Sequence, residues 1–586
     1  MAWTNDGTAD RSRIYRERKK NRLVIRNYFM KSVATLILFT SVVFCQSESQ
    51  TYPVAATDPK NMRDYPGGRG EHQLIIYTSE YGTTTTGTNQ WGAEATVKDD
   101  IVIKIGGNNS PIRPGEYVLS GHGRARVFLQ RNVKVGAKIL RTDTSVIVSF
   151  DMESFRIYSD MRKGELIRKY EKIKAQLSEA ERSSLKAAID SLKIVRDAPN
   201  AVAVPSVDSS LYDEGMRLLD EIEYRTTVSP AVEGRGVWHR PSEKNSDEIA
   251  ATVQRLAQSG FNMIFLETIW RGESIYPGFI TQQKKEFIGF DPLRVFIDEG
   301  EKHGVEIHAW VHTFFVGYVG IDEDTSSGPI LQNHPEWQLV KRNGEKISAA
   351  EPGYLYLNPA HPQAQDFIAS LYREIRTTYS DLAGIQMDYI RYPVNVPLDE
   401  SSDYSAVSRV RFKEQYGVDP QEINPTDHPE QWEQWRLWRE QVITGFVKRI
   451  RWENPEVLLS ADIFPDIEEA EKTKMQNWGT WANSGYVNFL APMVYTVNTD
   501  WIAEAIGKMR SLIGENFPLH VGLAPYLRLT PSQLLQQIEV CREIKASGII
   551  LFSTSNLSDE QLRLLHIGPF RNNAQPPSLI IKPNKQ

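Results

Sequence analysis

Three acidic residues each follow a short apolar run, in positions that suit catalytic carboxyl groups. Glu267 closes the run NMIFLE, Asp388 closes GIQMD and Asp462 closes VLLSAD. An ionised carboxyl is costly to bury beside apolar residues unless it has a partner or a chemical role. Two carboxyl groups that flank a glycosidic bond can hydrolyse it, one protonating the leaving oxygen and the other acting as nucleophile or base. The three residues therefore predict glycosidic cleavage, with polar packing of a protein core as the alternative.

These carboxyls fall within a long alternation of apolar runs and amphipathic helical segments. Eight strand-like runs are separated by helical stretches such as DEIAATVQRLAQSG and PSQLLQQIEVCREIKASG. Strict alternation with eight repeats is typical of a closed parallel barrel. An open doubly wound sheet would carry a glycine-rich phosphate loop after its first strand, and the sequence has none there. The predicted fold class is α/β, a (β/α)8 TIM barrel, with strands at 234–239, 262–267, 305–312, 384–388, 457–462, 487–495, 519–525 and 548–553.

The barrel fold determines which ends of the strands hold the chemistry. In TIM barrels the active site lies at the carboxyl ends of the strands. Successive side chains on a strand face opposite ways, so the apolar set in 305–312 would pack on the helices and the alternate set would face the lumen. Asp388 would face inward at the end of its strand, and a salt bridge to Arg391 is the alternative reading of that residue. The lumen-facing set of 305–312 would be Glu306, His308, Trp310 and His312.

Further polar and aromatic residues near the strand ends could bind a sugar. Imidazole, amide, guanidinium and phenol groups can hydrogen-bond hydroxyls or position carboxylates. Indole rings offer flat apolar faces on which sugar rings can stack. Each of these residues is equally compatible with a structural role. The substrate-binding candidates are Trp238, His239, Trp270, Trp310, His312, Asn358, Arg391 and Tyr495.

Several motifs within residues 232–560 resemble the glycosyl hydrolase-like family 10 barrels. They are RGVWHRP, HAWVHTFF, HPEW, YLNPAHPQAQDFI, GIQMDYIRYP and APMVYT. Members of that family are bacterial glycosidases, and a characterised relative cleaves peptidoglycan glycan strands stripped of their peptides. The order around GIQMDYIR is also similar to the alpha-amylase clan, where the Asp is the nucleophile. The resemblance implies Asp388 as nucleophile, Asp462 where the clan has its acid, and Glu267 as a reserve for that acid.

The 586 residues exceed what one hydrophobic core usually holds, so several domains are expected. Before the barrel, strands are predicted at HQLIIYT, DIVIKIG, GEYVLSG, ARVFLQ and TSVIVSFD, after a polar linker at about 46–70. The stretch GEYVLSGHGRARVFLQ resembles pieces of the phosphodiester glycosidase domain, without a complete catalytic constellation. Ser178 and Glu181 form a Ser-x-x-Glu capping box that predicts the start of a helix. The predicted parts are a basic and signal segment (1–50), a small β-rich accessory domain (70–155), a helical linker (156–230), the barrel (232–570) and a disordered tail (571–586).

The N-terminal segment is typical of an export signal. Residues 11–31 carry nine Lys and Arg, and the apolar run 32–44 follows directly. Thirteen residues are too few to span a bilayer as a helix but suit the apolar core of a signal peptide. The protein is therefore expected to be exported, either periplasmic or extracellular. Cys45 would tether it to a membrane if lipidated, although Val43 and Phe44 fit a lipobox poorly, and Met30 is an alternative start.

The expected partner is a polysaccharide substrate, and the composition gives no reason to expect a nucleic-acid partner. A formal charge of −6 gives no electrostatic case for nucleic acid. No cofactor and no metal are expected, and two cysteines provide no disulfide framework. Two alternatives stay open: a carbohydrate-binding barrel without catalysis, and a metal-dependent carbohydrate deacetylase that uses His308 and His312. Four residues apart on a strand, those histidines would lie about 13 Å apart, too far to share one ion.

Overall fold

The computed structural model describes residues 49–577, except 60–72, 89–91, 107–108, 199–204, 321–326, 395–397, 399–400 and 528. The side chains of 205–209 are also outside the description. Residues 1–48 of the predicted signal segment, which include Cys45, and the last nine residues of the tail therefore lie outside the described residues. No helix in the described part of the chain is long and apolar enough to cross a membrane.

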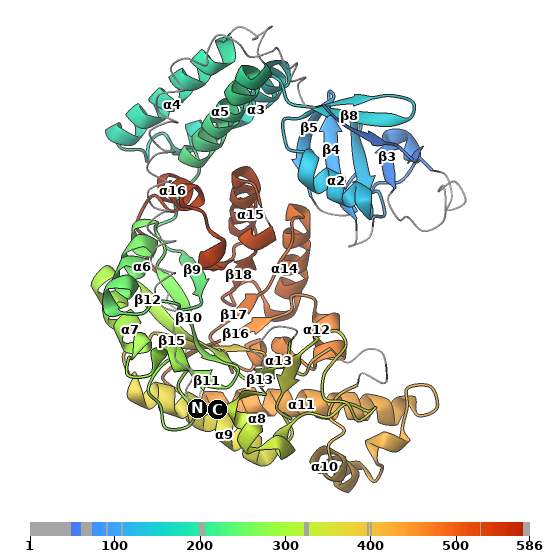
Figure 1. Ribbon diagram of the computed structural model, residues 1–586, viewed down its shortest axis with the longest axis vertical. Coiled ribbons are helices and arrows are strands. Elements are labelled where there is room, and N and C mark those ends of the chain that lie inside the picture. Colours follow the sequence, from blue (N-terminus) through green and yellow to red (C-terminus); the bar gives the residue numbers. More distant parts are fainter. Residues whose placement is uncertain are drawn as a thin grey trace, which may run out of the picture.

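Eight parallel strands form the barrel at the centre of the molecule (Figure 1). Hydrogen-bonded neighbours run in the order β17-β16-β15-β12-β10-β9-β19-β18. Isolated parallel bridges from Leu490 to Leu519 and from Met493 to Gly522 close the ring between β17 and β18. The predicted TIM barrel is confirmed, with its strands at β9 (Gly234–His239), β10 (Met263–Trp270), β12 (Glu306–His312), β15 (Gly384–Asp388), β16 (Leu458–Ile463), β17 (Phe489–Pro492), β18 (His520–Leu523) and β19 (Gly548–Phe552).

Side chains of the strands divide between the lumen and the helices as the alternation predicted. Ile307, Ala309 and Val311 of β12 join the large cluster that packs under the helices. Trp310 instead belongs to a separate buried cluster inside the barrel. The lumen is thus filled by side chains rather than open, as in other barrels of this size. Its apolar members are Trp238, Met263, Phe265, Trp310, Phe489, Ala491 and Ile550.

Helices surround the barrel, and their starts carry ordinary capping signals. The Thr530 side chain accepts a hydrogen bond from the Gln533 N–H and thereby caps α15 (Pro531–Glu543). Ser558 caps α16 (Asp559–Ile567) in the same way through Gln561. The other helices of the barrel region are α6 (Ser246–Gln258), α7 (Pro292–His303), α8 (Gly328–Asn333), α9 (Pro362–Thr378), α10 (Ala406–Tyr416), α11 (Pro429–Glu453), α12 (Ile467–Lys474), α13 (Trp478–Asn483) and α14 (Thr499–Ile513).

The N-terminal part is a sheet of eight strands in the order β1-β8-β7-β5-β4-β6-β3-β2. It starts within the segment predicted to be a linker, because β1 pairs with β8. The predicted strand at ARVFLQ is wrong: this segment lies in helix α2 (Arg124–Asn132), whose buried Ala125, Phe128 and Leu129 have helical spacing. The strands are β1 (Gln50–Pro53), β2 (Ala56–Thr57), β3 (Leu74–Thr78), β4 (Ala93–Lys98), β5 (Ile101–Ile105), β6 (Glu116–Gly121), β7 (Lys138–Arg141) and β8 (Ser145–Ser149).

Three helices connect the sheet to the barrel: α3 (Met152–Ile173), α4 (Glu179–Asp197) and α5 (Pro205–Arg225). The predicted capping box at Ser178 is confirmed at the start of α4. The sheet also contacts the barrel directly. Lys104 forms a 2.7 Å ion pair with Asp500 of α14, and the Gln533 side chain donates a 2.7 Å hydrogen bond to the carbonyl of Ile105.

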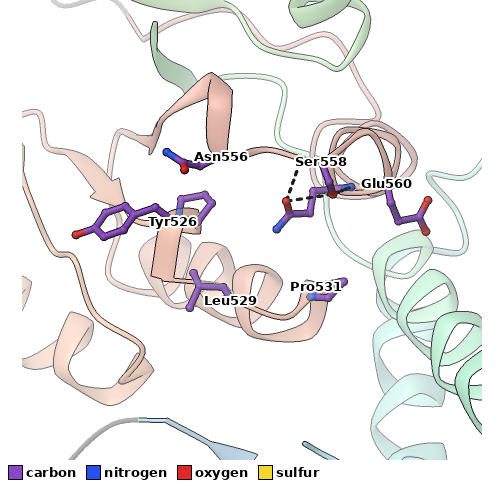
Figure 2. A pocket seen from close by; sticks show the side chains of 8 residues that line it. Tyr526, Leu529, Pro531, Asn556, Ser558 and Glu560 are labelled. Carbon is purple, nitrogen blue, oxygen red and sulfur yellow. Dashed lines mark hydrogen bonds between the residues drawn. The ribbon is translucent and has the colours of Figure 1, made fainter. Parts of the chain in front are cut away.

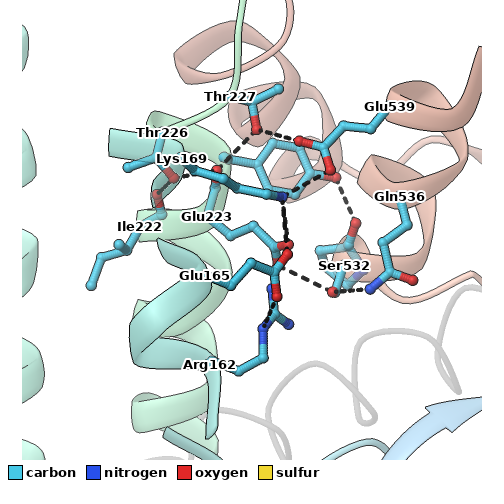
Figure 3. A network of polar contacts seen from close by, with 12 residues as sticks. Arg162, Glu165, Lys169, Ile222, Glu223, Thr226, Thr227, Ser532, Gln536 and Glu539 are labelled. Atoms are coloured by element: carbon cyan, nitrogen blue, oxygen red, sulfur yellow. Dashed lines mark hydrogen bonds and ion pairs between the residues drawn. The ribbon is translucent and has the colours of Figure 1, made fainter. Parts of the chain in front are cut away.

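A buried ionic network fixes these helices to the barrel (Figure 3). Glu223 of α5 accepts from Arg162 at 2.6 Å and from Lys169 at 3.1 Å, both on α3. Lys169 also pairs with Glu539 of α15 at 2.8 Å, and Ser532 of α15 donates to Glu223 at 3.1 Å. The carboxylate of Glu223 is almost fully buried, so its two cations replace the hydration it loses.

The described part of the predicted disordered tail is held against the barrel. The Gln575 N–H donates to the carbonyl of Ala231, and Gln575 forms a parallel bridge with Val232. The Arg571 guanidinium donates to the carbonyls of Arg225 and Thr227. Residues 571–577 are therefore ordered against the segment that precedes the first barrel strand. Residues 578–586 lie outside the described residues.

Candidate active site

A cavity of about 380 Å³ opens among the carboxyl ends of the barrel strands. It contains two of the three predicted carboxyls, Asp388 of β15 and Asp462 of β16. Most of its remaining wall is aromatic, and two arginines lie in it. A cavity with paired carboxyls at this end of a barrel is where TIM-barrel chemistry takes place. The lining residues are Trp238, Arg240, Trp310, Asp388, Tyr389, Arg391, Asp462, Phe464, Met493, Tyr495 and Phe552.

The two carboxyls of the cavity are neighbours across adjacent strands. In the parallel register, Met387 pairs with Ala461, so the next residues, Asp388 and Asp462, stand at the same height. Neighbouring strands lie about 4.8 Å apart, which brings the two carboxyls close together. His312 pairs with Asp388 on the other side, so the carboxyls continue a polar row that begins on β12.

Asp388 is held as an acceptor by two N–H groups. The indole N–H of Trp310 donates to Asp388 Oδ2 at 3.0 Å. The backbone N–H of Tyr389 donates to Asp388 Oδ1 at 2.6 Å. Tyr389 has a φ of 49°, a left-handed conformation that few non-glycine residues adopt, and the sharp turn directs its N–H at the carboxylate. Donors to both oxygens stabilise the ionised form of Asp388.

The surroundings of Asp388 and Asp462 affect their pKa values differently. Burial raises the pKa of Asp388, but the Trp310 and Tyr389 N–H groups and the nearby Arg391 and Arg240 charges oppose this rise. Burial and then the charge of Asp388 raise the pKa of Asp462 well above its usual value. Asp462 Oδ1 also has no hydrogen-bond partner among the described residues. Two carboxyls whose environments push their pKa values apart are suited to divide the roles of base and acid.

The third predicted carboxyl, Glu267, lies behind the cavity wall. The Arg240 guanidinium donates from Nε to Glu267 Oε1 at 3.0 Å. His312 Nε2 is 3.6 Å from Glu267 Oε1 and 3.6 Å from Asp388 Oδ2, so these two oxygens are no more than twice that distance apart. Burial, followed by the charges of Arg240 and Lys284, lowers the pKa of His312 well below its usual value, which keeps the imidazole neutral.

Arg240 is a cavity residue that the sequence analysis missed. Its guanidinium lies 5.5 Å from the centre of the Trp310 ring and 5.4 Å from that of Phe552, and its side chain is 55% exposed. The stacked cation is thus fixed by Glu267 and faces the space that holds the carboxyls. Its place directly after the first strand was the available signal, because strand-end loops build TIM-barrel sites. The other lining residues not predicted are Tyr389, Phe464, Met493 and Phe552.

Four of the predicted sugar-binding residues line the cavity. The Trp238 indole N–H donates to Gln386 Oε1 at 2.7 Å, which fixes the ring against the lumen. The Tyr495 ring meets the Trp238 ring edge-on with the centroids 6.5 Å apart. Arg391 pairs with Glu351 at 2.6 Å, so its ion-pair partner is not Asp388. Trp310, described above as the donor to Asp388, is the fourth.

Three other predicted residues have structural partners outside the cavity. His239 faces the helices, with Nδ1 2.8 Å from the Thr554 hydroxyl and Nε2 3.1 Å from Glu243. Trp270 packs between the cations of Arg271 and Lys284. Asn358 is fully buried, and its amide donates to the hydroxyls of Ser405 and Ser408. His312, buried between Glu267 and Asp388, contacts the carboxyls from behind the wall.

The deacetylase alternative would need a metal site on the two histidines of β12. His308 lies deeper in the lumen, 4.9 Å from the Phe265 ring and 3.2 Å from Glu306. His312 is at the level of the carboxyls. Among the described residues, no three His, Cys, Asp or Glu side chains are grouped so that they could hold a metal ion.

Fold and site together define the class of the protein. A closed parallel barrel that carries two buried carboxyls at the ends of neighbouring strands, in a cavity with aromatic walls, has the parts of a glycoside hydrolase. A family model described as Glycosyl hydrolase-like 10 matches residues 233–523. The barrel belongs to this family, as its motifs indicated, and the chain is a glycoside hydrolase.

Two relatives of the chain are named as glycosyl hydrolases. The chain is 22% identical over 410 residues to Glycosyl hydrolase YngK of Bacillus subtilis (strain 168), covering 62% of this chain and 72% of that protein. It is 26% identical over 152 residues to Glycosyl hydrolase DigH of Escherichia coli (strain K12). That match covers 23% of this chain, and it spans about a third (32%) of the length of DigH.

The chain also matches solved structures at low sequence identity. The catalytic domain of beta-amylase from Paenibacillus polymyxa matches with a TM-score of 0.41 and 12% identity, over 57% of this chain and 95% of that one. Beta-galactosidase from Bacillus circulans sp. alkalophilus matches with a TM-score of 0.40 and 13% identity, over 55% and 50% of the two chains.

Proposed function

We propose that the protein cleaves O-glycosidic bonds of a polysaccharide with Asp388 and Asp462 as its two catalytic carboxyls. The observation that carries the proposal is the pairing of these carboxyls at one height on adjacent strands, inside one cavity. Asp388, which accepts two N–H hydrogen bonds, is the ionised partner and acts as nucleophile or base. Asp462, whose pKa is raised by burial and by the charge of Asp388, keeps a proton and acts as the acid.

The reaction then follows the order that the two protonation states allow. Asp462 donates its proton to the glycosidic oxygen as the bond to the anomeric carbon breaks. Positive charge develops on the sugar ring in this transition state, and the Asp388 carboxylate stabilises it from the other side. As nucleophile, Asp388 bonds to the anomeric carbon, and a water molecule activated by the Asp462 carboxylate then hydrolyses this ester. As base, Asp388 instead takes a proton from the water molecule that attacks the anomeric carbon. The N–H donors from Trp310 and Tyr389 hold Asp388 in place, so little reorganisation is needed as the charge develops.

The walls of the cavity support a glycan as the substrate. Trp238, Tyr495 and Phe552 present ring faces and edges around the carboxyls. Aromatic rings bind the apolar faces of sugars, while the carboxyls and Arg391 can hydrogen-bond hydroxyl groups. Within this class we favour peptidoglycan glycan strands, because the family to which the barrel belongs includes an enzyme that cleaves them.

Location is part of the same proposal. A cell-wall substrate lies outside the cytoplasm, which agrees with the basic and apolar residues before position 45. We propose that the protein is exported to the periplasm or cell exterior, with attachment through Cys45 if that residue is lipidated. Radiolabelled-palmitate incorporation into the protein, compared with a Cys45→Ser variant, tests the attachment.

The function is tested by glycan release from purified protein lacking residues 1–48, with Asp388→Asn as the matched control. Peptide-free peptidoglycan strands are assayed beside plant, algal and bacterial polysaccharides, and products are identified by mass spectrometry. Release from one substrate that is lost in Asp388→Asn supports the proposal. Retention of the protein on a polysaccharide without release would instead favour a binding barrel. Release that survives in Asp388→Asn would overturn the assignment of that residue.

A further inference from the structure

The protein has a second cavity, of about 470 Å³ (Figure 2). It is formed by the loops that follow β18 and β19, the last two strands of the barrel. Figure 2 shows Tyr526 at one end and Glu560 at the other, with Asn556 and Leu529 on opposite sides. The lining residues are Pro525, Tyr526, Leu529, Pro531, Asn556, Ser558, Glu560 and Gln561.

Tyr526 connects this second cavity to the catalytic one. Its ring centroid is 5.8 Å from that of Tyr495 and 6.0 Å from that of Phe552, and both contacts are edge-to-face. Tyr495 and Phe552 line the catalytic cavity, while Tyr526 lines the second one. The two cavities are thus lined by aromatic rings that contact one another. A chain molecule that leaves the catalytic cavity past Tyr495 would pass over Tyr526.

The lining of the second cavity has the mixed character of a sugar site. The Tyr526 side chain is 43% exposed, and Pro525, Leu529 and Pro531 add apolar surface. The side chains of Asn556 and Glu560 supply an amide and a carboxylate, which can hydrogen-bond hydroxyl groups. Sugar sites combine flat apolar surface with a few fixed polar groups in this way.

The polar groups are held in place by local structure. The Asn556 amide donates to the Ser553 hydroxyl at 3.1 Å, in the short helix η8 (Thr554–Asn556). Ser558 and Gln561 bond each other's backbone and side chain in the capping box of α16. Glu560 accepts from Arg563 at 2.8 Å. Because these groups are already ordered, a ligand would lose little free energy in arranging them.

We infer that the second cavity is a distal subsite that binds a sugar unit of the same glycan chain whose bond is cleaved at Asp388 and Asp462. This inference rests on the proposed function and adds that the enzyme favours chains long enough to reach past Tyr526. Binding at a distance from the reacting bond contributes to kcat/KM only for substrates that extend that far. The enzyme therefore selects for chain length.

The test measures kcat/KM for a series of oligosaccharides of the cleaved glycan, from the shortest substrate upward. In the wild-type protein kcat/KM rises with length and then levels off. In Tyr526→Ala the ratio of kcat/KM for long over short substrates falls about tenfold, the loss expected for about 1.4 kcal/mol of stacking. Tyr526→Phe keeps the ring and retains the ratio. Trp452→Ala, which removes an exposed ring on α11 remote from both cavities, is the matched control and leaves the ratio unchanged.

Binding isotherms in the Asp388→Asn background provide a second readout, because no turnover occurs. The long oligosaccharide should bind more weakly to the Tyr526→Ala, Asp388→Asn double variant, by a similar factor. A length ratio unaffected by Tyr526→Ala, or an equal loss on all lengths, would overturn the subsite. If the wild-type protein cleaves no glycan of any length, the proposed function fails instead. Thermal melting of each variant confirms that the comparison is made between folded proteins.

Discussion

Trp310 donates its indole N–H to Asp388 Oδ2 at 3.0 Å, from the strand directly beside that of the carboxylate. Replacing Trp310 by Phe keeps an aromatic ring and removes this donor. The ionised form of Asp388 loses support, so the pKa of Asp388 rises further and the acidic limb of the pH–rate profile moves to higher pH. We expect kcat/KM to fall about 10- to 100-fold at neutral pH, the size expected for a lost hydrogen bond to a charged group.

The matched control for this change is Trp481→Phe. Trp481 on α13 is fully buried and donates its indole N–H to the Thr444 hydroxyl at 3.0 Å, away from the cavity. The Trp481→Phe substitution should lower the melting temperature and leave the pH–rate profile unchanged. An acidic limb that stays unmoved in Trp310→Phe would show that Asp388 is not the group that must be ionised.

The acid can be identified by varying the leaving group. In Asp462→Asn we expect hydrolysis of the natural glycan to fall about 10²- to 10⁴-fold, because its sugar leaving group needs a proton. Aryl glycosides with acidic phenol leaving groups should lose far less. Glu267→Gln is the comparison, since Glu267 is the other carboxyl near Asp388. If the leaving-group dependence appears in Glu267→Gln and not in Asp462→Asn, the role of acid belongs to Glu267.

Asp462 should also give stability a defined pH dependence. Its pKa is higher in the folded than in the unfolded chain, since burial and the Asp388 charge raise it. The folded state therefore binds more protons, and stability falls as the pH rises from the unfolded pKa, near 3.9, to the folded pKa. Asp462→Asn removes this loss, which is about 1.4 kcal/mol for each pH unit between the two values.

The measurement is the melting temperature of wild type and Asp462→Asn between pH 4 and pH 8. We expect Asp462→Asn to be the more stable protein at pH 7 and the difference to shrink toward pH 4. Asp466→Asn, at the exposed start of α12, controls for charge removal alone. A difference in melting temperature between wild type and Asp462→Asn that stays constant with pH would contradict the raised pKa of Asp462.

Asn358 should affect folding and not substrate binding. Its amide donates to the Ser405 and Ser408 hydroxyls at 2.6 and 2.9 Å, and its carbonyl oxygen accepts from the Ala360 N–H at 2.8 Å. Asn358→Ala removes these three hydrogen bonds and should cost about 1–3 kcal/mol of stability, even though the Ser405 and Ser408 hydroxyls still bond each other. Below the melting temperature, KM and kcat should match those of the wild type. A rise in KM alone would place Asn358 in contact with substrate.

Glu223 is expected to control the attachment of the helices to the barrel. Burial raises the pKa of this carboxyl, but the charges of Arg162 and Lys169 outweigh burial and the pKa is lowered overall. Glu223→Gln leaves two cations without their shared anion, at a cost of about 3–5 kcal/mol. Because the folded pKa is depressed, this stabilisation exists above the unfolded pKa and is lost as the pH falls through the folded value. Denaturant unfolding should therefore give different free energies of unfolding for wild type and Glu223→Gln at pH 7. The difference should disappear in acid.

The sequence predicted the barrel because its strands are short apolar runs bounded by turns, and every one of the eight was found. The alternation of side chains along a strand also separates two of the predicted sugar-binding residues. Trp238 and His239 are consecutive on one strand, so they face opposite ways and only one of them could enter the cavity. Trp238 lines the cavity, while His239 packs against Phe296 under the helices.

Other features depend on contacts between segments that are distant in the sequence. Arg240 owes its place to the rings of Trp310 and Phe552, which come from other strands. Glu267 and Asp462 both end apolar runs of the sequence, but β10 continues to Trp270, and only the folded structure shows which of the two acids reaches the cavity. Helix α2 was mistaken for a strand because Ala125, Phe128 and Leu129 follow a sheet segment whose apolar runs are equally short.

The ionic network around Glu223 has a consequence for how this enzyme could be divided or recombined. Ser532 and Glu539 belong to the barrel, yet their partners lie on α3 and α5, more than three hundred positions earlier in the chain. A fragment cut at the first barrel strand would expose these groups, and a barrel grafted from a relative would need matching ones. We therefore expect the barrel to fold stably only together with helices α3 and α5.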